Sequence, residues 1–233
     1  LVGGVIMFSC TSGQHSLSID TEQTDRILMN ARSAREAWSR SHNFVEGWLK
    51  HVDPQTGLIP RNLRESYFWN AKDAAADNYP FMVLTTFFTD SVLFHGKMKE
   101  MLQTEIEVTS RLGACPATFD FKSRTFLENP VDTAGVIFGS AEYMKDGLLP
   151  LTEWLGQSPW SERMIAILND LDKLIDVADG DYFGGAQVEE VNGDLLQVLS
   201  RIYWMTGNNR YLDWALKIGD HYLAGKNNPT NLT

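Results

Sequence analysis

Residues 81–88 read Phe-Met-Val-Leu-Thr-Thr-Phe-Phe, a segment that is apolar around almost its whole circumference when drawn as a helix. Such a helix needs neighbours on all sides. The segments 92–112 and 160–178 instead carry charged residues on one face, which is typical of helices that border water. Two concentric layers of helical hairpins require this mixture of buried and amphipathic helices, whereas a four-helix bundle does not. The sequence therefore predicts an all-α fold, and we favour a toroid of helical hairpins.

Apolar residues recur at helical spacing along most of the chain, and each such stripe is expected to be buried against neighbours. In residues 21–51 the stripe includes Ile27 and Trp38. Ser158 followed by Pro159 predicts a capped helix start. We expect about seven helices, separated by longer loops at 53–76, 114–131 and 179–190 and with no alternation long enough for a sheet; the predicted helices are 21–51, 79–90, 92–112, 133–148, 160–178, 191–206 and 209–224.

The N-terminal residues indicate export. Leu1 to Phe8 are apolar and are followed by Ser9 and Cys10, which resembles the second half of a bacterial lipoprotein signal peptide with Cys10 as the lipidated residue. We therefore divide the chain into a signal-peptide remnant and linker at 1–20 and a helical domain at 21–233. The predicted location is the periplasm or the outer surface, with membrane contact only through the lipid anchor. Cys115 is then the only thiol in the domain, so no internal disulfide is expected.

Charge and motif content exclude several classes of function. The formal charge is −10, from 30 acidic and 20 basic residues, and no cluster of Lys and Arg is present, which argues against a nucleic-acid partner. The five His residues have no H-x-H or H-E-x-x-H spacing, so a zinc site is not expected. No P-loop or dinucleotide fingerprint occurs. We predict neither a metal nor a cofactor.

Two turns resemble those of the six-hairpin glycosidase-like superfamily, the (α/α)6-barrel carbohydrate-active proteins. One is Asp53-Pro-Gln-Thr-Gly-Leu-Ile-Pro60, and the other is Trp204-Met-Thr-Gly-Asn-Asn-Arg-Tyr-Leu-Asp-Trp-Ala215. The resemblance implies a barrel of six hairpins, of which this chain would form a truncated part with about seven helices. It also implies a carbohydrate substrate, held in a funnel made by loops and the ends of inner helices.

The stretch 61–80 is the richest in candidate site residues, because polar and aromatic side chains gather just before the apolar helix. We propose Asp77 and Asp73 as catalytic carboxylates, and as substrate-binding residues Arg61, Arg64, Trp69, Asn78 and Tyr79. A structural alternative is that Asp77 or Asn78 caps the helix that Pro80 opens.

A second cluster lies between Asp179 and Asp194. Glu190 and Asp194 are further catalytic candidates, and Tyr182 is a candidate for stacking on a sugar. Acidic groups are also favoured electrostatically at a helix N-terminus, so capping remains an alternative for both. Glu128 and Asp132 form a third acidic site, in which capping is the better explanation of Asp132.

These residues favour glycoside hydrolysis, which uses two carboxylates as acid and as base or nucleophile. Asp77 would act with Glu190, Asp194 or a carboxylate beyond Thr233. A polysaccharide lyase or uronyl hydrolase remains open, in which Arg61 or Arg64 would bind a uronate carboxylate. A non-catalytic glycan-binding surface lipoprotein is the alternative from another class.

Overall fold

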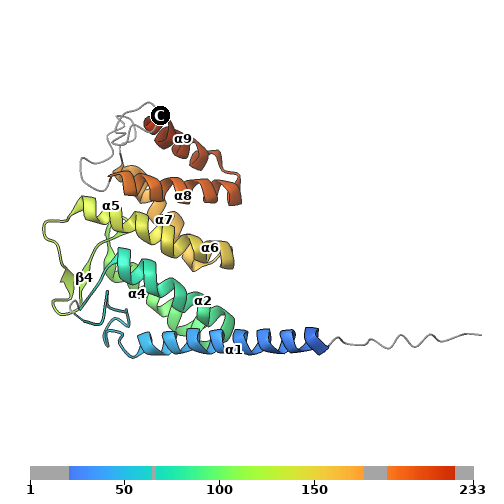
Figure 1. Ribbon diagram of the computed structural model, residues 1–233. Coiled ribbons are helices and arrows are strands. Elements are labelled where there is room, and N and C mark those ends of the chain that lie inside the picture. The colour runs from blue at the N-terminus through green and yellow to red at the C-terminus, as the bar shows by residue number, and fades with distance from the viewer. Residues whose placement is uncertain (1–20, 65–66, 176–187, 224–233) are drawn as a thin grey trace, which may run out of the picture. The chain divides into compact units, whose positions relative to one another are not determined.

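The computed structural model describes residues 21–64, 67–175 and 188–223 (Figure 1). The chain divides into two compact units at Arg40, inside the first helix, α1 (Thr21–Leu49). In the first unit α1 exposes Ile27, Met29 and Trp38, and the buried residue of this helix is Val45, in the second unit. The expectation that the apolar stripe of this segment is buried was therefore wrong for its N-terminal part.

The described residues of the second unit form three helical hairpins. Several of their helices include a π-helical turn (η). In chain order the elements are η1 (Ala71–Asn78), α2 (Tyr79–Thr89), α3 (Ser91–Leu93), η2 (Phe94–Met98), α4 (Lys99–Thr109), α5 (Thr133–Glu142), η3 (Tyr143–Leu148), α6 (Leu149–Leu155), α7 (Pro159–Leu174), α8 (Val188–Thr206) and α9 (Asn209–Leu223). Counted as continuous segments with α1, the described residues form the seven helices that the sequence predicts, so the all-α class is confirmed.

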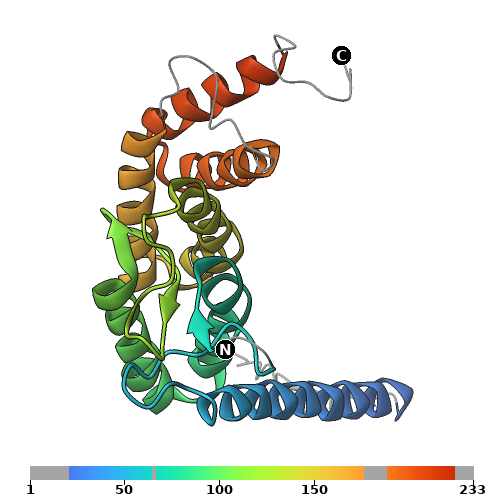
Figure 2. The ribbon, with the colours of Figure 1, turned by 90° about the vertical axis from the view of Figure 1, so that its left-hand side faces the viewer.

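The hairpins form two layers within this unit. The inner row consists of η1–α2, then α5–η3–α6, then α8, and the middle segment contacts both of its neighbours (Figure 2). On the other side, η2 packs on α2, α7 on α6 and η3, and α9 on α8. The mostly apolar α2 thus lies in the inner row and the amphipathic α7 in the outer row. The expectation that α2 has neighbours on all sides was wrong, because Phe81 is 65% exposed and Phe87 and Phe88 are also exposed.

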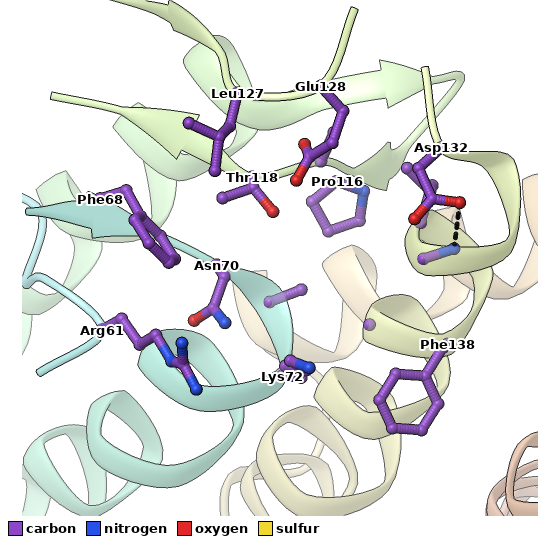
Figure 3. A pocket seen from close by; sticks show the side chains of 15 residues that line it. Arg61, Phe68, Asn70, Lys72, Pro116, Thr118, Leu127, Glu128, Asp132 and Phe138 are labelled. Atoms are coloured by element: carbon purple, nitrogen blue, oxygen red, sulfur yellow. Dashed lines mark hydrogen bonds between the residues drawn. The ribbon is translucent and has the colours of Figure 1, made fainter. Parts of the chain in front are cut away.

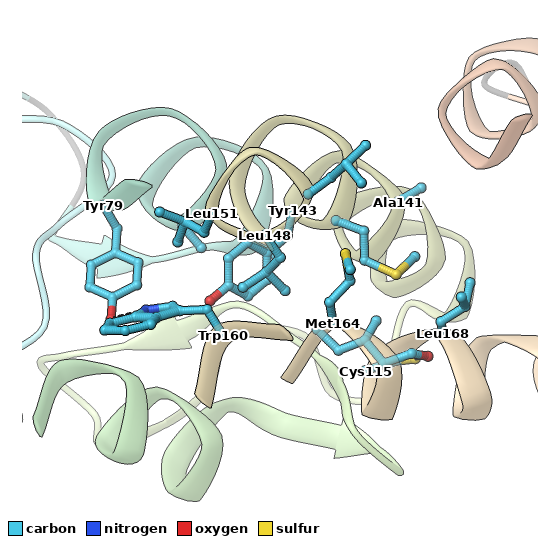
Figure 4. Packing of buried hydrophobic residues seen from close by; sticks show 14 of the residues in the cluster. Tyr79, Cys115, Ala141, Tyr143, Leu148, Leu151, Trp160, Met164 and Leu168 are labelled. Carbon is cyan, nitrogen blue, oxygen red and sulfur yellow. Dashed lines mark hydrogen bonds between the residues drawn. The ribbon is translucent and has the colours of Figure 1, made fainter. Parts of the chain in front are cut away.

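A buried aromatic group joins the first two hairpins (Figure 4). The Tyr79 hydroxyl donates to the Met98 carbonyl oxygen at 2.6 Å and accepts from Trp160 Nε1 at 2.8 Å. The Phe94 ring stacks on Trp160 with 5.3 Å between centroids. Because every polar atom of this group that faces the core is bonded, it can be buried at little cost. Cys115 is also buried and its thiol is free.

Short strands that were not predicted occur in the longer loops, and one replaces the end of the predicted helix 92–112, which stops at Thr109. β1 (Phe68–Trp69), β4 (Phe119–Asp120) and β5 (Thr125–Phe126) form a three-stranded antiparallel sheet, and β2 (Ser110–Leu112) pairs with β3 (Cys115–Pro116). Two or three residues are too few for an alternating pattern to be recognised. The first sheet joins the loop before η1 to the loop before α5, and so brings the N-terminal ends of two inner helices together.

The turn that begins at Asp53 also links these two loops. The buried Asp53 carboxylate accepts hydrogen bonds from Thr56 and from the Arg124 guanidinium, at 2.6 and 3.0 Å for the latter. Burial alone would raise the pKa of this carboxyl, but the bonds from Arg124 and Thr56 lower it to about 2. Gly57 has a φ of +68°, which a side chain would disfavour. The motif therefore has a structural role in this turn.

Side chains cap the N-terminal ends of several helices. Ser158 and Ser161 form a reciprocal capping box at α7, and the Asp132 carboxylate accepts from the Gly135 amide at the start of α5, as predicted. The alternative that Asp77 or Asn78 caps the apolar helix was wrong. The continuous helix begins eight residues earlier, where the Asn70 side chain accepts from the Ala74 amide, and Asn78 makes no side-chain cap.

Candidate functional site

A pocket of about 290 Å³ opens at the N-terminal ends of η1 and α5 (Figure 3). Arg61, Asn70 and Lys72 lie on one side of it, and loop residues on the other. Its lining mixes cations, carboxylates, a hydroxyl and two phenyl rings; those side chains are Arg61, Phe68, Asn70, Lys72, Thr118, Leu127, Glu128, Asp132 and Phe138. Such a surface suits a small polar ligand that also has apolar faces.

Asp73 is held next to this pocket by two of its lining residues. Arg61 Nε lies 2.9 Å from Asp73 Oδ2, and the Asn70 amide donates to the same oxygen. Asn70 is buried, and its own oxygen caps η1. The helix start therefore fixes the position of Asp73, and its carboxylate has a cation and an amide as partners.

Lys72 differs from Arg61, because no carboxylate among the described residues pairs with it. Its ammonium lies 5.5 Å from the centroid of the Phe138 ring, a cation–π contact, and within the described ranges it forms no ion pair. Among the pocket carboxylates, Asp132 is occupied as a helix cap, while Glu128 faces the pocket from the loop after β5. The pocket therefore keeps a cation available for a ligand.

Asp77 lies one turn after Asp73 on η1 and is exposed. It makes no hydrogen bond or ion pair with another described residue. Partial burial and then the negative charges of Asp73, Asp146 and Glu142 raise the pKa of Asp77, and Lys145 opposes them. Asp73 and Asp77 are thus two carboxylates on one helix with different surroundings: the first is ion-paired, and the second is crowded by like charge.

The charges that act on Asp77 belong to a cluster around Lys145. The Lys145 ammonium lies 2.9 Å from Glu142 Oε1, 3.2 Å from Asp146 Oδ2 and 2.9 Å from Asp194 Oδ1. The Asp194 side chain is buried. Burial, followed by the hydrogen bond and charge of Glu142, raises the pKa of Asp194 to about 7, against the influence of Lys145. Three carboxylates from two inner segments thus share one cation.

The structure links four of the predicted site residues. Arg61 contacts Asp73, and both Asp77 and Asp194 interact with the Lys145 cluster. Glu190 is exposed, one turn before Asp194 on α8. Arg64 is exposed and does not line the pocket. Tyr182 and Cys10 lie outside the described residues.

The prediction that Trp69 and Tyr79 stack on a sugar was wrong, because both side chains are buried. Trp69 is 2% exposed and packs edge-on against Tyr143, with 6.5 Å between centroids. Tyr79 is 5% exposed, and its hydroxyl is bonded within the core. Buried rings without an open face cannot stack on a ligand. Asn78 is half-buried and does not line the pocket.

Sequence reasoning missed Glu142, Lys145 and Asp146. A signal was present, because these charged residues interrupt an otherwise apolar inner helix between Val136 and Leu151. A charge on a helix that is buried on most sides needs a partner or a function.

No group of described residues has the composition and spacing of a metal site, and no described helix is long and apolar enough to span a membrane. Comparison with known proteins found no matching family, curated protein or solved structure.

Proposed function

We propose that this protein is a carbohydrate-active enzyme, a glycoside hydrolase that uses Asp73 and Asp77 as its pair of carboxylates. The observation that carries the proposal is the position of Asp73, which contacts the pocket residues Arg61 and Asn70. Asp77 follows one turn later on η1, and neither carboxylate lines the pocket itself. We further propose that the hairpins belong to a six-hairpin barrel, with the pocket in its funnel. The two layers of hairpins and the position of the pocket at inner-helix ends support this arrangement.

The two carboxylates suit different steps of glycoside cleavage. A general acid benefits from a raised pKa, and partial burial followed by the negative charges of Asp73, Asp146 and Glu142 raises the pKa of Asp77. The second carboxylate acts as base or nucleophile. Asp73 suits that role because the Arg61 cation and the Asn70 amide stabilise its negative charge. The π-helical geometry of η1 agrees with a functional segment, since such turns often occur at functional sites.

The pocket supplies groups that bind a sugar ring. Arg61, Lys72 and Asn70 present donors to hydroxyl groups, and Phe68 and Phe138 present rings to the apolar faces of a sugar. At about 290 Å³ the pocket lies at the small end of the range for ligand sites, which suits one sugar unit of a longer chain.

A polysaccharide lyase or uronyl hydrolase is the second candidate, and Lys72 is the observation that favours it. Its ammonium has no carboxylate partner within the described residues and lines the same pocket as Arg61. Together these cations could bind a uronate carboxylate.

We also propose an export signal with lipidation at Cys10, which puts the expected substrate outside the cytoplasm.

Incubation with a panel of neutral and uronate-containing glycans tests the proposal. We expect release of reducing ends, and Asp77→Asn should lower this rate about 100-fold or more because the general acid is lost. The control is Asp213→Asn, which makes the same change on the exposed surface of α9 and should leave the rate unchanged.

The products distinguish the alternatives. Absorbance from unsaturated sugars would replace the hydrolase with a lyase. Glycan binding without turnover would favour a non-catalytic receptor, and the absence of both would overturn the proposed function.

A further inference from the structure

The pocket has a basic wall and an acidic wall (Figure 3). Arg61, from the loop before η1, and Lys72, in the first turn of η1, form the basic wall. Glu128 and Asp132 lie across the pocket, in the loop that leads into α5. A pocket with opposite charges on its two walls is complementary to a ligand with opposite charges at its two ends.

On the basic wall, Lys72 is the cation that remains available to a ligand. The Arg61 guanidinium lies 2.9 Å from Asp73 and 5.9 Å from the centroid of the Phe68 ring. The Lys72 ammonium lies 5.5 Å from the centroid of the Phe138 ring and forms no ion pair with any described residue. Because Phe138 is 8% exposed and packed in the core, it is a fixed support for this ammonium.

On the acidic wall, Glu128 is the available carboxylate. Asp132 accepts from the Gly135 amide at 3.0 Å and so serves as a helix cap. Glu128 is half-buried, and it forms no hydrogen bond or ion pair with another residue that the structure describes. The Leu127 amide donates to the Thr118 carbonyl oxygen at 3.0 Å, which anchors the chain next to Glu128 on the pocket wall.

Lys72 and Glu128 do not neutralise each other. Both line the pocket, and no ion pair joins them. A partly buried charge without a partner is unfavourable, and a ligand that supplies the opposite charge removes this cost. A neutral sugar offers only hydroxyl groups to both side chains, whereas a sugar with an amine and an acid group offers each its counter-charge. The volume of about 290 Å³ favours a ligand that has both groups on one sugar unit.

We propose that the pocket binds a zwitterionic sugar unit, with the ammonium of the sugar at Glu128 and its carboxylate at Lys72. This inference rests on the proposed function, because a sugar is the ligand there, and it names the class of sugar. Arg61 and Asp132 face the same two groups of the ligand, but each already has a partner in the protein. Lys72 and Glu128 are therefore the residues that determine specificity.

Calorimetric titration of the whole chain with four monosaccharides tests this inference. The probes are glucose, which is neutral, glucosamine, which has the amine, glucuronate, which has the carboxylate, and muramic acid, which has both. Titration at about pH 6 keeps the amines protonated and the carboxylates ionised. Muramic acid should bind on the order of 10-fold more tightly than either singly charged sugar, as expected for one added charged hydrogen bond.

Two variants should separate the two charges. Glu128→Gln should weaken binding of glucosamine and muramic acid on the order of 10-fold and leave glucuronate unchanged. Lys72→Met keeps the aliphatic stem and should weaken glucuronate and muramic acid, with glucosamine unchanged. Lys72→Glu should weaken glucuronate and strengthen glucosamine, a gain that a misfolded variant cannot produce.

The matched controls make the same changes on exposed helix surfaces. Glu162→Gln on α7 and Lys217→Met on α9 should leave all four affinities unchanged. A general effect of net charge would appear in these controls as well as in the pocket variants.

Several outcomes would overturn the inference: no binding of any of the four sugars, no advantage of muramic acid over the singly charged sugars, or equal effects of Glu128→Gln and Lys72→Met on every probe. Cleavage of neutral glycans at a rate that neither variant changes would also overturn it, and would leave the proposed function standing. The expected pattern of affinities without cleavage of any glycan would overturn the proposed hydrolase and leave the assignment of the ligand standing.

Discussion

Two buried ion-pair systems within the described residues, one around Arg163 and one around Lys145, differ in how completely their atoms are bonded. In the outer layer, Arg163 of α7 donates through Nε to Glu105 Oε2 at 3.0 Å and through a terminal nitrogen to Oε1. Thr109 donates to the same carboxylate, and Arg163 also donates to the Ala114 carbonyl oxygen at 2.8 Å. Lys145, on the inner row, pairs with three carboxylates, and one buried oxygen of Asp194 accepts no hydrogen bond from any residue that the structure describes.

This difference separates a structural ion pair from a candidate functional one. Glu105 and Arg163 are one anion and one cation whose bonds connect α4, α7 and the β2–β3 turn, which is what a fold requires of buried charge. Around Lys145 the carboxylates outnumber the cation, and burial together with the neighbouring Glu142 raises the pKa of Asp194. Groups whose protonation is poised in this way are typical of sites that handle protons.

The largest effect on stability is expected at the Arg163–Glu105 pair, whose charged groups are fully hydrogen-bonded. Arg163→Met leaves Glu105 buried without its cation and should lower the free energy of unfolding by about 3–5 kcal/mol, as measured by urea denaturation. Combining it with Glu105→Leu removes both charges and should recover most of that loss. A single variant that unfolds like the parent would contradict the structural reading of this pair.

A smaller effect on stability, which depends on pH, is expected at Asp53. Its carboxylate is hydrogen-bonded on both oxygens, as that of Glu105 is, but its cation, Arg124, is more exposed than Arg163. The folded state lowers the pKa of Asp53 to about 2 from 3.8. The stabilisation is therefore complete above pH 4 and is lost as the pH falls from about 4 to about 2. Asp53→Asn should cost about 2 kcal/mol at neutral pH, and its unfolding curve should approach that of the parent near pH 2. A constant difference down to pH 2 would show that the charge of Asp53 is not what stabilises the turn.

Much of the helical layout could be predicted from the sequence because helix period, caps and glycines are local signals. The helix start marked by Ser158 and Pro159 was readable in this way. The start of η1 was not, because Asn70 is one of many polar residues in a loop and only its bond to Ala74 marks it as the cap.

The candidate site was predicted only in part, for reasons of distance along the chain and of burial. Asp73 and Asp77 were proposed from the sequence because they lie close to Arg61, whereas Lys145 meets Asp194 only through the packing of η3 against α8. Trp69 and Tyr79 were misassigned because composition does not distinguish an aromatic residue that faces a ligand from one that faces the core. Burial depends on the tertiary contacts, which no local pattern contains.

The smallest effect is expected where the ion pair is neither buried nor crowded. Arg210 at the start of α9 reaches Asp172 of α7 at 2.6 Å, with side chains that are 48% and 35% exposed. Asp172→Asn should therefore change the free energy of unfolding by less than about 1 kcal/mol. The difference should vanish in salt on the order of 1 M, where the screening length is about 3 Å. The Arg163→Met effect should persist in the same salt, because water and ions do not enter between its partners. If both effects faded equally, burial would not be the property that distinguishes these pairs.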